Sequence, residues 1–377
     1  MIYHLLWNLR IGERLGFYAY QNVSFRCVMA VLTSMAIAFV LGPRTIRWLK
    51  SKNINDRPES HHARINEMNK DKSGIPTMGG MIIITAVLSG TILWAKLTNP
   101  FVQKAVFVIV WFGVLGGMDD YLKLTRTKDS KSRDGLKAWE KLIFQFGGAA
   151  LIALFLFYDF SNIEDGKRFW LPFYKYSLPL TNWAFIIIAI LYISATSNAV
   201  NLTDGMDGLA TGCLGIISVV LIVLCYIASE KMVSFDQTTW ASYLLIPHIP
   251  NAGELSIFYS SMLGALLGFL WFNCYRAMVF MGDTGSLPLG AAIGYGALVT
   301  KNEILLLIVG GVFMVELASV VLQVGYFKYS GGKRLFKISP IHHHFQASDC
   351  PEPQIVVRFW ILAVAFAVLG LATLKIR

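Results

Sequence analysis

Five aspartates stand at or beside the ends of apolar runs, where an unpaired carboxylate near hydrocarbon is costly. They are Asp119, Asp120, Asp204, Asp207 and Asp283, and most have a glycine close by. Capping of a following helix could explain any one of them, but five such acids need a further reason. Glycines let a backbone approach a ligand, and Mg²⁺ prefers carboxylate, water and phosphate oxygens. These residue types favour a site for Mg²⁺ and a phosphorylated ligand, in which the ion would also relieve the repulsion between the two adjacent acids.

Lysines and histidines near the acids are suited to the same ligand. Lys72 and Lys123 adjoin the acidic motifs and could contact phosphates; other basic residues of the same loops can be explained by anionic lipid headgroups. The run His342 to His344 suggests zinc by residue type, but adjacent histidines cannot all bind one ion, and no Cys or His partner stands at ligand spacing. Phosphate binding, proton donation and a structural role in a loop remain open for these histidines.

The composition is that of an integral membrane protein. The 377 residues are 55% hydrophobic and 15% charged, with a mean hydropathy of +0.55, whereas a soluble domain has about 25% charged residues. Apolar runs cover almost the whole chain, so we expect one polytopic membrane domain over residues 1–377. The five cysteines form no CxxC pair, which argues against a disulfide framework or a cysteine zinc site. The start of the chain lacks the pattern of a secretory signal and resembles an interfacial lead-in.

A membrane span needs about 20 apolar residues, and this criterion predicts an all-α protein with ten transmembrane helices. The predicted spans are 23–42, 77–96, 101–118, 140–158, 183–200, 209–228, 255–272, 286–300, 304–327 and 357–374. An even number of spans places both termini on one side. The connectors after the odd-numbered spans hold 19 of the 33 lysines and arginines, so the positive-inside rule makes them cytoplasmic and puts both termini outside.

All five predicted cytoplasmic connectors carry a polar motif. In chain order the motifs are "KSGIPTMGG", "MDDYLK", "NAVNLTDGMDGLA", "FMGDTGS" and "SPIHHHF". One site at the cytoplasmic face explains this distribution, and it predicts a membrane enzyme that acts with Mg²⁺ on a soluble pyrophosphate-containing substrate and on a lipid. A transporter or flippase for lipid-linked sugars is the alternative, but its polar groups should lie near the middle of the membrane. A receptor or scaffold would not need five acids at one face.

These motifs, with "PTMGG", "DDYLK", "FMGDTGSL" and "PIHHHF" as the most specific parts, resemble the phospho-N-acetylmuramoyl-pentapeptide transferases. This family belongs to the polyprenyl-phosphate N-acetylhexosamine-1-phosphate transferases, and the resemblance runs nearly end to end. It implies transfer from UDP-MurNAc-pentapeptide to undecaprenyl phosphate, which gives lipid I and UMP with Mg²⁺ as cofactor. It also implies a multi-pass protein of the bacterial inner membrane with ten helices and a cytoplasmic active site. The protein is expected to form a homodimer, to act in peptidoglycan synthesis and to bind no nucleic acid.

The resemblance assigns roles to positions of this sequence. Asp283 matches the principal Mg²⁺ ligand, Asp119 the proposed base and Asp120 its supporting neighbour, and these three together with His342 are the expected catalytic residues. Phe280 matches an aromatic residue that stacks on uracil. The expected substrate-binding residues are Lys72, Thr77, Lys123, Asn201, Asp204, Asp207, Asn273, Phe280, Gly282, Gln323 and His343. Met206 replaces a leucine that is common in the family, which is a conservative difference.

Two mechanisms are compatible with these residues. In the direct one, Asp119 takes a proton from undecaprenyl phosphate, whose oxygen attacks the β-phosphate of the UDP-sugar. In the covalent one, an aspartate attacks first and forms an acyl-phosphate intermediate, and Asp283 is the favoured candidate for this attack. An aspartate that binds Mg²⁺ is a poorer nucleophile, so we favour the direct mechanism.

Overall fold

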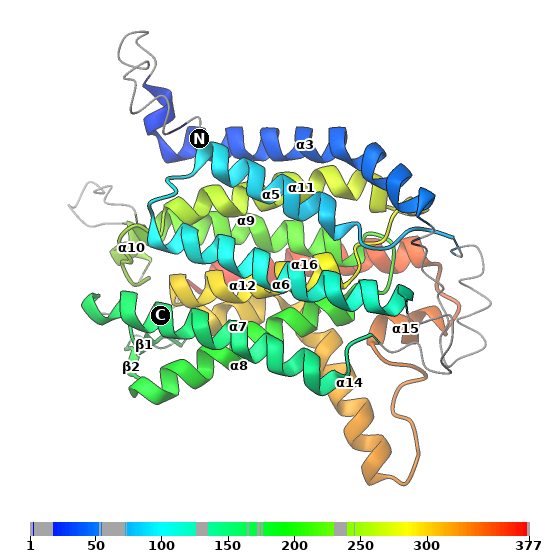
Figure 1. Cartoon of the computed structure of the whole chain (residues 1–377). Helices are drawn as coiled ribbons and strands as arrows, with labels where there is room; N and C mark the ends of the chain where they lie inside the picture. Colours follow the sequence, from blue (N-terminus) through cyan, green and yellow to red (C-terminus); the bar gives the residue numbers. More distant parts are fainter. Residues whose placement is uncertain are drawn as a thin grey trace.

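The long helices lie side by side in a bundle, with short elements and loops at the two ends (Figure 1). The structure is a computed structural model, and it describes residues 3, 18–52, 54, 72, 74–125, 135–163, 166–171, 174, 176–229, 240–244 and 246–374. The longer helices are α3 (Val23–Ser51), α5 (Gly80–Trp94), α6 (Pro100–Thr125), α7 (Ala138–Asp159), α8 (Asn182–Thr203), α9 (Leu209–Ser229), α11 (Glu254–Asn273), α12 (Asp283–Thr300), α14 (Gly311–Tyr329) and α16 (Glu352–Thr373). The shorter elements are η1 (Ala19–Gln21), η4 (Phe160–Asn162), α10 (Trp240–Tyr243), α13 (Glu303–Val309), α15 (Ile341–Gln346) and the antiparallel strands β1 (Arg168–Phe169) and β2 (Leu178–Pro179).

Side-chain caps fix where several of these helices begin. The side chain of Asn22 accepts a hydrogen bond from the amide of Ser24 at the start of α3, and Thr181 does the same for Ala184 at the start of α8. Both are residue types that satisfy the free amides of a first helical turn. The polar residues that flank the apolar runs therefore set the limits of these helices.

Eight helices within the described residues are long and apolar enough to cross a membrane. Helix α7 shows the expected dimensions, because Trp139 near its start is 58% exposed and Tyr158 near its end is 78% exposed. A helix rises about 29 Å between positions 139 and 158, close to the roughly 30 Å thickness of the hydrocarbon core. Aromatic rings at that spacing suit the two membrane–water interfaces.

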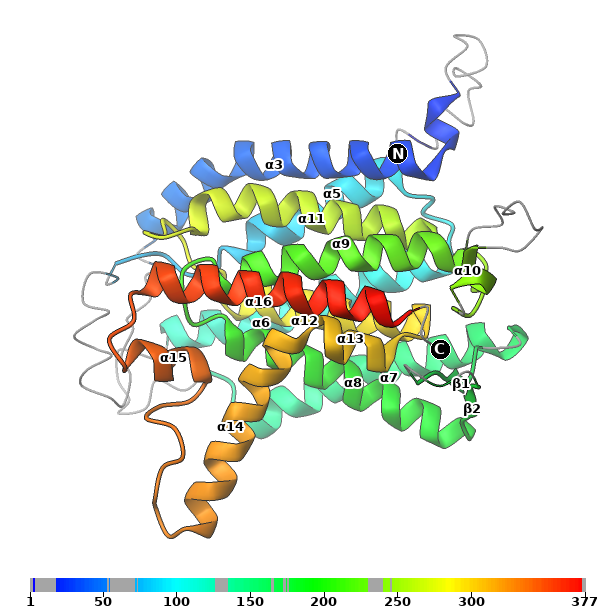
Figure 2. The same ribbon diagram turned by 180° about the vertical axis from the view of Figure 1, so that it is seen from behind.

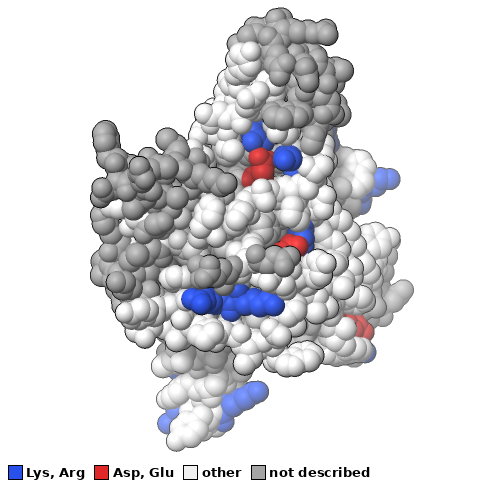
Figure 3. Space-filling model, turned by 90° about the vertical axis from the view of Figure 1, so that its left-hand side faces the viewer, with Lys and Arg blue, Asp and Glu red and all other residues white. Residues whose placement is uncertain are grey.

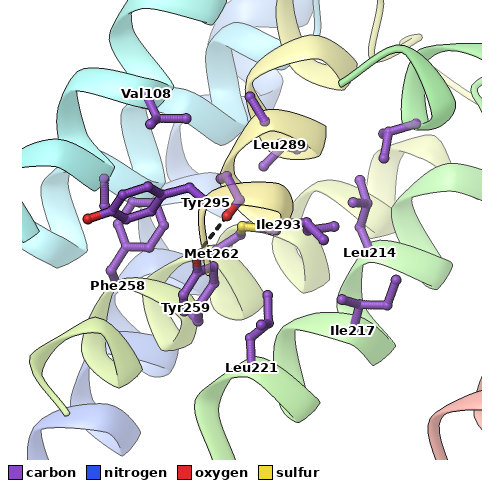
Figure 4. Packing of buried hydrophobic residues seen from close by; sticks show 14 of the residues in the cluster. Val108, Leu214, Ile217, Leu221, Phe258, Tyr259, Met262, Leu289, Ile293 and Tyr295 are labelled. Carbon is purple, nitrogen blue, oxygen red and sulfur yellow. Dashed lines mark hydrogen bonds between the residues drawn. The ribbon is translucent and has the colours of Figure 1, made fainter. Parts of the chain in front are cut away.

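Helix α12 lies at the centre of the bundle, and all of its residues are buried. It packs mainly against α6 and α8, with further contacts to α9 and α5. Figure 4 shows side chains of α12 meeting side chains of α6, α9 and α11. The approach of α6 depends on Gly116, because a Cβ there would lie 2.0 Å from the carbonyl oxygen of Asp283. A small residue at this contact brings the end of α6 against the first residue of α12.

The all-α prediction is confirmed apart from the two short strands, which lie in the predicted outer connector 159–182. The predicted ninth span, 304–327, is wrong as a single helix. It is divided at Gly310 into α13 and α14, and α14 leans away from the bundle (Figure 2). A second glycine follows, where a Cβ on Gly311 would lie 2.7 Å from the ring of Phe366 on α16. The number of helices that cross the membrane, and which side each end faces, stay predictions.

Both labelled chain ends lie at the end of the bundle that carries α10 and the β1–β2 hairpin, whereas α15 lies at the opposite end (Figures 1 and 2). Figure 3 views the α10 and hairpin end, where a few blue and red side chains interrupt a mostly white and grey surface. The predicted lead-in over 1–20 falls largely outside the described residues. So do four basic residues of the second predicted cytoplasmic connector, Arg126, Lys128, Lys131 and Arg133.

Candidate active site

The carboxylate of Asp283, at the start of α12, collects contacts from three other helices. Lys141 on α7 places Nζ 2.6 Å from Oδ2, and Lys123 on α6 places Nζ 3.0 Å from the same oxygen. The other oxygen, Oδ1, accepts a hydrogen bond of 2.6 Å from the side-chain amide of Asn201 on α8. The acid predicted to hold Mg²⁺ is thus the point at which α6, α7, α8 and α12 meet.

Asp119 shares both lysines with Asp283. Its Oδ2 lies 3.0 Å from Lys123 Nζ and 3.3 Å from Lys141 Nζ, and its Oδ1 accepts a hydrogen bond from the amide of Leu136. The two acids and two ammonium groups compensate one another, which lowers the cost of burying carboxylates at the end of a membrane helix. We call these four residues, Asp119, Asp283, Lys123 and Lys141, the acid–lysine cluster.

Asp120 caps α12, and its Oδ1 also lies 4.0 Å from Lys123 Nζ of this cluster. Its carboxylate accepts hydrogen bonds from the amides of Asp283 and Thr284 and from the hydroxyl of Thr284, at 3.2, 2.9 and 2.7 Å. Gly282 makes room for the cap: its φ is +71°, and a Cβ there would lie 2.6 Å from Asp120 Oδ2. The positive end of α12 and Lys123 therefore lower the repulsion between the adjacent acids.

A second group of charges surrounds Lys72. Its ammonium lies 2.7 Å from Asp207 and 2.6 Å from Glu352, the first residue of α16. Asp207 also accepts a hydrogen bond from the amide of Ala277 and donates one from its own amide to Glu352. Burial lowers the pKa of Lys72, but the two carboxylates outweigh burial and raise this pKa above its usual value. Lys72 is therefore a fixed cation that holds three loops together.

Phe280 lies beside this group, with its ring centroid 5.9 Å from Lys72 Nζ. Its backbone is fixed on both sides, because its amide donates to the carbonyl of Pro76 and its carbonyl accepts from the amide of Gly79. The ring is half-buried. A fixed and partly accessible ring suits stacking against a planar base.

Asp204 ends α8 and lies near the acids of both α6 and α12. Burial, together with the negative charges of Asp283 and Asp120, raises its pKa from 3.8 to about 8. At neutral pH this carboxyl is mainly protonated, so it can donate a hydrogen bond as well as accept one.

The predicted histidines divide into an inner and an outer residue. His342 has no exposure, and its Nδ1 lies 3.0 Å from Oε2 of Glu316 on α14. His343 is less deeply buried; its ring lies 4.2 Å from that of His342, and its Nδ1 is 3.0 Å from Gln346 Oε1. Burial, the neighbouring His342 and the charge of Lys72 lower the pKa of His343 to about 4, so it is neutral at physiological pH.

Three predicted substrate-binding residues lie apart from these contacts or face other groups. Thr77 adjoins the turn before α12, because a Cβ on Gly282 would lie 2.9 Å from Thr77 Oγ1. The side-chain amide of Asn273 is buried. Its oxygen accepts a hydrogen bond from the hydroxyl of Thr211, and its nitrogen donates one to the carbonyl of Val279. The amide oxygen of Gln323 accepts from the backbone amides of residues 335 and 336, which holds the segment after α14.

The sequence interpretation missed three charged residues of this region: Lys141, Glu316 and Glu352. Lys141 and Glu352 stand at the edges of predicted spans, so the criterion applied to the aspartates would have found both. Glu316 is different, because it lies within the predicted ninth span and is buried inside the protein. A charge within a span is itself a sign of function.

The donor set suits Mg²⁺ that arrives with a phosphorylated ligand. No cluster of three or more His, Cys, Asp or Glu side chains that could hold a metal occurs in the described part of the chain. Mg²⁺ commonly binds through one or two carboxylates, several waters and substrate phosphates. Asp283 offers such a carboxylate, with the acid of Asp119 sharing its lysines. The residues therefore fit an ion completed by the substrate.

Comparison with known proteins finds similarity over the whole chain. A family model described as glycosyl transferase family 4 matches residues 102–301, which include all but the first two residues of α6 and the whole of α12. Three relatives carry the name phospho-N-acetylmuramoyl-pentapeptide-transferase, and each aligns over 100% of both chains. They come from Citrifermentans bemidjiense at 44% identity, Thermodesulfovibrio yellowstonii at 43% and Desulfotalea psychrophila at 41%.

Proposed function

The chain belongs to the phospho-N-acetylmuramoyl-pentapeptide transferases within glycosyl transferase family 4, and on that premise we propose that it makes lipid I. It transfers phospho-N-acetylmuramoyl-pentapeptide from UDP-MurNAc-pentapeptide to undecaprenyl phosphate and releases UMP. The reaction belongs to peptidoglycan synthesis and takes place at the cytoplasmic face of the bacterial inner membrane. The protein works there as a multi-pass enzyme and as a homodimer.

The observation that carries this proposal is the acid–lysine cluster at the start of the most buried helix. It contains two carboxylates and two ammonium groups from α6, α7 and α12. Each ammonium nitrogen lies within 3.3 Å of an oxygen of both carboxylates. The cluster stands at the ends of apolar helices, where a lipid phosphate and a soluble nucleotide can both reach it. Phosphoryl transfer depends on such fixed charges around the transferred group.

The two lysines have partners that a substrate can replace. Phosphate oxygens of the UDP-sugar and of the lipid compete with Asp119 and Asp283 for Lys123 and Lys141. As each ammonium turns to a phosphate, Asp119 loses its compensating charges and becomes a better proton acceptor. Substrate binding thus prepares the base. Mg²⁺, held by Asp283, would neutralise negative charge on the pyrophosphate.

The direct mechanism is a single displacement at phosphorus, without a covalent enzyme intermediate. Asp119 accepts the proton of the lipid phosphate, and the freed oxygen bonds to the β-phosphorus of the UDP-sugar. The bond from that phosphorus to the bridging oxygen breaks, and UMP leaves with the electron pair. Asp283 is poorly suited to attack first, because a carboxylate that holds Mg²⁺ would be a poorer nucleophile and because Asn201 also engages its Oδ1. That arrangement supports the direct route over the covalent one.

Lys72, Asp207 and Phe280 form the nucleotide end of the proposed site. The half-buried ring of Phe280 stacks on uracil, and the neighbouring Lys72 lies within 5.9 Å of that ring. Asp207 fixes Lys72 and the 277 segment. These residues orient the nucleotide so that its β-phosphate points toward the acid–lysine cluster.

The test is UMP release by the purified protein in detergent, with and without undecaprenyl phosphate and Mg²⁺. The proposal expects release only when the lipid phosphate, UDP-MurNAc-pentapeptide and Mg²⁺ are all present. Exchange of labelled UMP into the UDP-substrate without any lipid would favour the covalent route. Absence of lipid I under every condition would refute the proposed function. Light scattering of the same sample gives the oligomeric state.

A further inference from the structure

A fully buried acid and histidine face each other behind the proposed nucleotide site. Glu316 on α14 and His342 on α15 both have zero exposure, and Oε2 of the acid lies 3.0 Å from Nδ1 of the ring. The two residues come from helices on either side of the segment 330–340. Neither takes a step in the mechanism above.

The far side of the His342 ring lies against the turn that follows α8. A Cβ on Gly205 would lie 2.4 Å from Nε2 of His342 and 3.4 Å from Nε2 of His343. Gly205 stands between Asp204 and Asp207, and Asp207 holds Lys72. The ring therefore fills the space between Glu316 and the turn at 204–207, with no room for a side chain on Gly205.

This arrangement costs stability. Removing a carboxylate from water is costly, and neither carboxylate oxygen of Glu316 nor either ring nitrogen of His342 has a hydrogen-bond partner among the described residues. The 3.0 Å approach of Oε2 to Nδ1 is an ion-pair contact without hydrogen-bond geometry. Apolar side chains of similar size would pack here at lower cost. A buried charged residue within a membrane helix is therefore better explained by function than by folding.

We propose that Glu316 is a positioning residue that acts through His342 on the 204–207 turn; this inference rests on the proposed function. The carboxylate fixes the position of the ring through its 3.0 Å contact with Nδ1. The ring, with His343 against it at 4.2 Å, then supports the backbone at Gly205. The supported turn keeps Asp207 and Lys72 in place beside Phe280. Glu316 thus sets the binding of the UDP-substrate without touching it.

The first test is the steady-state kinetics of Glu316→Gln, which keeps the size of the side chain and removes its charge. We expect KM for UDP-MurNAc-pentapeptide to rise about 10- to 100-fold, by analogy with the loss seen when the carboxylate partner of a metal-binding histidine is removed. KM for undecaprenyl phosphate should change less than twofold. An unchanged KM for the UDP-substrate, in a variant that keeps its wild-type melting temperature, would overturn the proposal.

Glu303→Gln is the matched control, because Glu303 is also a buried acid. It is 2% exposed and lies 3.1 Å from Lys301, at the opposite end of α12 from Asp283. Its removal should lower the melting temperature and leave KM for the UDP-substrate unchanged. An equal rise of KM in both variants would show a general effect of losing a buried acid and would contradict a positioning role.

A double-mutant cycle with His342→Gln tests whether Glu316 acts through the histidine. In the His342→Gln background, adding Glu316→Gln should raise KM for the UDP-substrate by less than a further twofold. If the double variant instead shows the product of the two single increases in KM, the residues act independently and the proposal is refuted. Gly205→Ala approaches the contact from the other side and stays informative if Glu316→Gln does not fold. It should raise KM for the UDP-substrate as well, and an unchanged KM would oppose the inference. If the wild-type protein releases UMP while these variants behave as wild type, only this inference fails; if the wild type releases none, the proposed function fails.

Discussion

Asp120 caps a helix that does not contain it, through hydrogen bonds to the backbone amide and the hydroxyl of Thr284. The cap connects α6 to the start of α12, where Asp283 lies. Its adjacent residue, Asp119, points instead to the lysines. Two neighbouring acids with the same side chain therefore have different tasks: one holds the catalytic helix, and the other belongs to the acid–lysine cluster.

Asp120→Asn should lower both stability and activity. The amide group would face helix amides that need an acceptor, so we expect a loss of about 1 kcal/mol, typical for a helix cap. Displacement of Asp283 should reduce UMP release by about 100-fold. Thermal melting and initial rates measure the two effects. Thr284→Val removes only the hydroxyl donor and should have a smaller effect on both; a larger one would contradict the capping role.

Lys141→Met should reduce kcat strongly while the protein stays folded. The ammonium contacts both Asp283 and Asp119, so its loss removes one of the two ammonium groups of the acid–lysine cluster. Removal of one such fixed charge typically costs about 100-fold in kcat. Lys137→Met, one helical turn earlier and at an exposed position, should keep wild-type activity. Equal rates in the two variants would exclude a role for Lys141.

Asp204 should make stability fall as pH rises. Its pKa is raised from 3.8 to about 8 in the folded protein, so the fold favours the neutral form. That stabilisation is fully present below about pH 4 and is lost as pH rises toward 8. Asp204→Asn is neutral at every pH. Its melting temperature relative to wild type, measured without Mg²⁺ or substrate, should therefore increase between pH 5 and pH 8. A difference that stays constant over this range would show that Asp204 is not protonated in the fold.

Phe280→Ala should raise KM for the UDP-substrate. Stacking of a base on an aromatic ring is worth about 1–3 kcal/mol, which corresponds to an increase of at least about fivefold. Phe280→Trp keeps a flat ring and should stay close to wild type. Binding of UDP measured by calorimetry should follow the same order. Loss of activity in Phe280→Ala without weaker nucleotide binding would remove the residue from the nucleotide site.

The convergence of the five motifs could be predicted from the sequence. The lengths of the apolar runs predict the spans, and the basic connectors predict which connectors lie at the same face of the membrane. The partners within the site could not be predicted in the same way. Contact between Lys141 and Asp283 depends on the rotation of α7 and α12 about their axes, which composition does not set. The break at Gly310 was missed for a related reason. Glycine inside an apolar run more often marks close helix packing, as Gly311 does here against Phe366. The division at Gly310 is seen only in the limits of α13 and α14.

The predicted role of Asn273 shows a further limit. A polar residue at the end of an apolar run can face a ligand or can hold neighbouring backbone, and the sequence does not separate the two. Here both ends of the amide are used, by Thr211 and by the carbonyl of Val279. Glu316 is the opposite case: a charge within a predicted span is a signal that the sequence already carries, whereas its contact with His342 is visible only in the structure.

The complete burial of α12 also shields the reaction from the surrounding lipid. A change in bilayer thickness or lateral pressure acts on helices that touch lipid, and these tilt or bend in response. Asp283 stands on a helix without such contact, so a disturbance reaches it only through the neighbours that enclose it. Asp283 can therefore keep its place while the outer helices adapt. Asp119 on α6 and Lys141 on α7 stand on helices with exposed apolar side chains, so these two partners follow the membrane from which the lipid substrate comes.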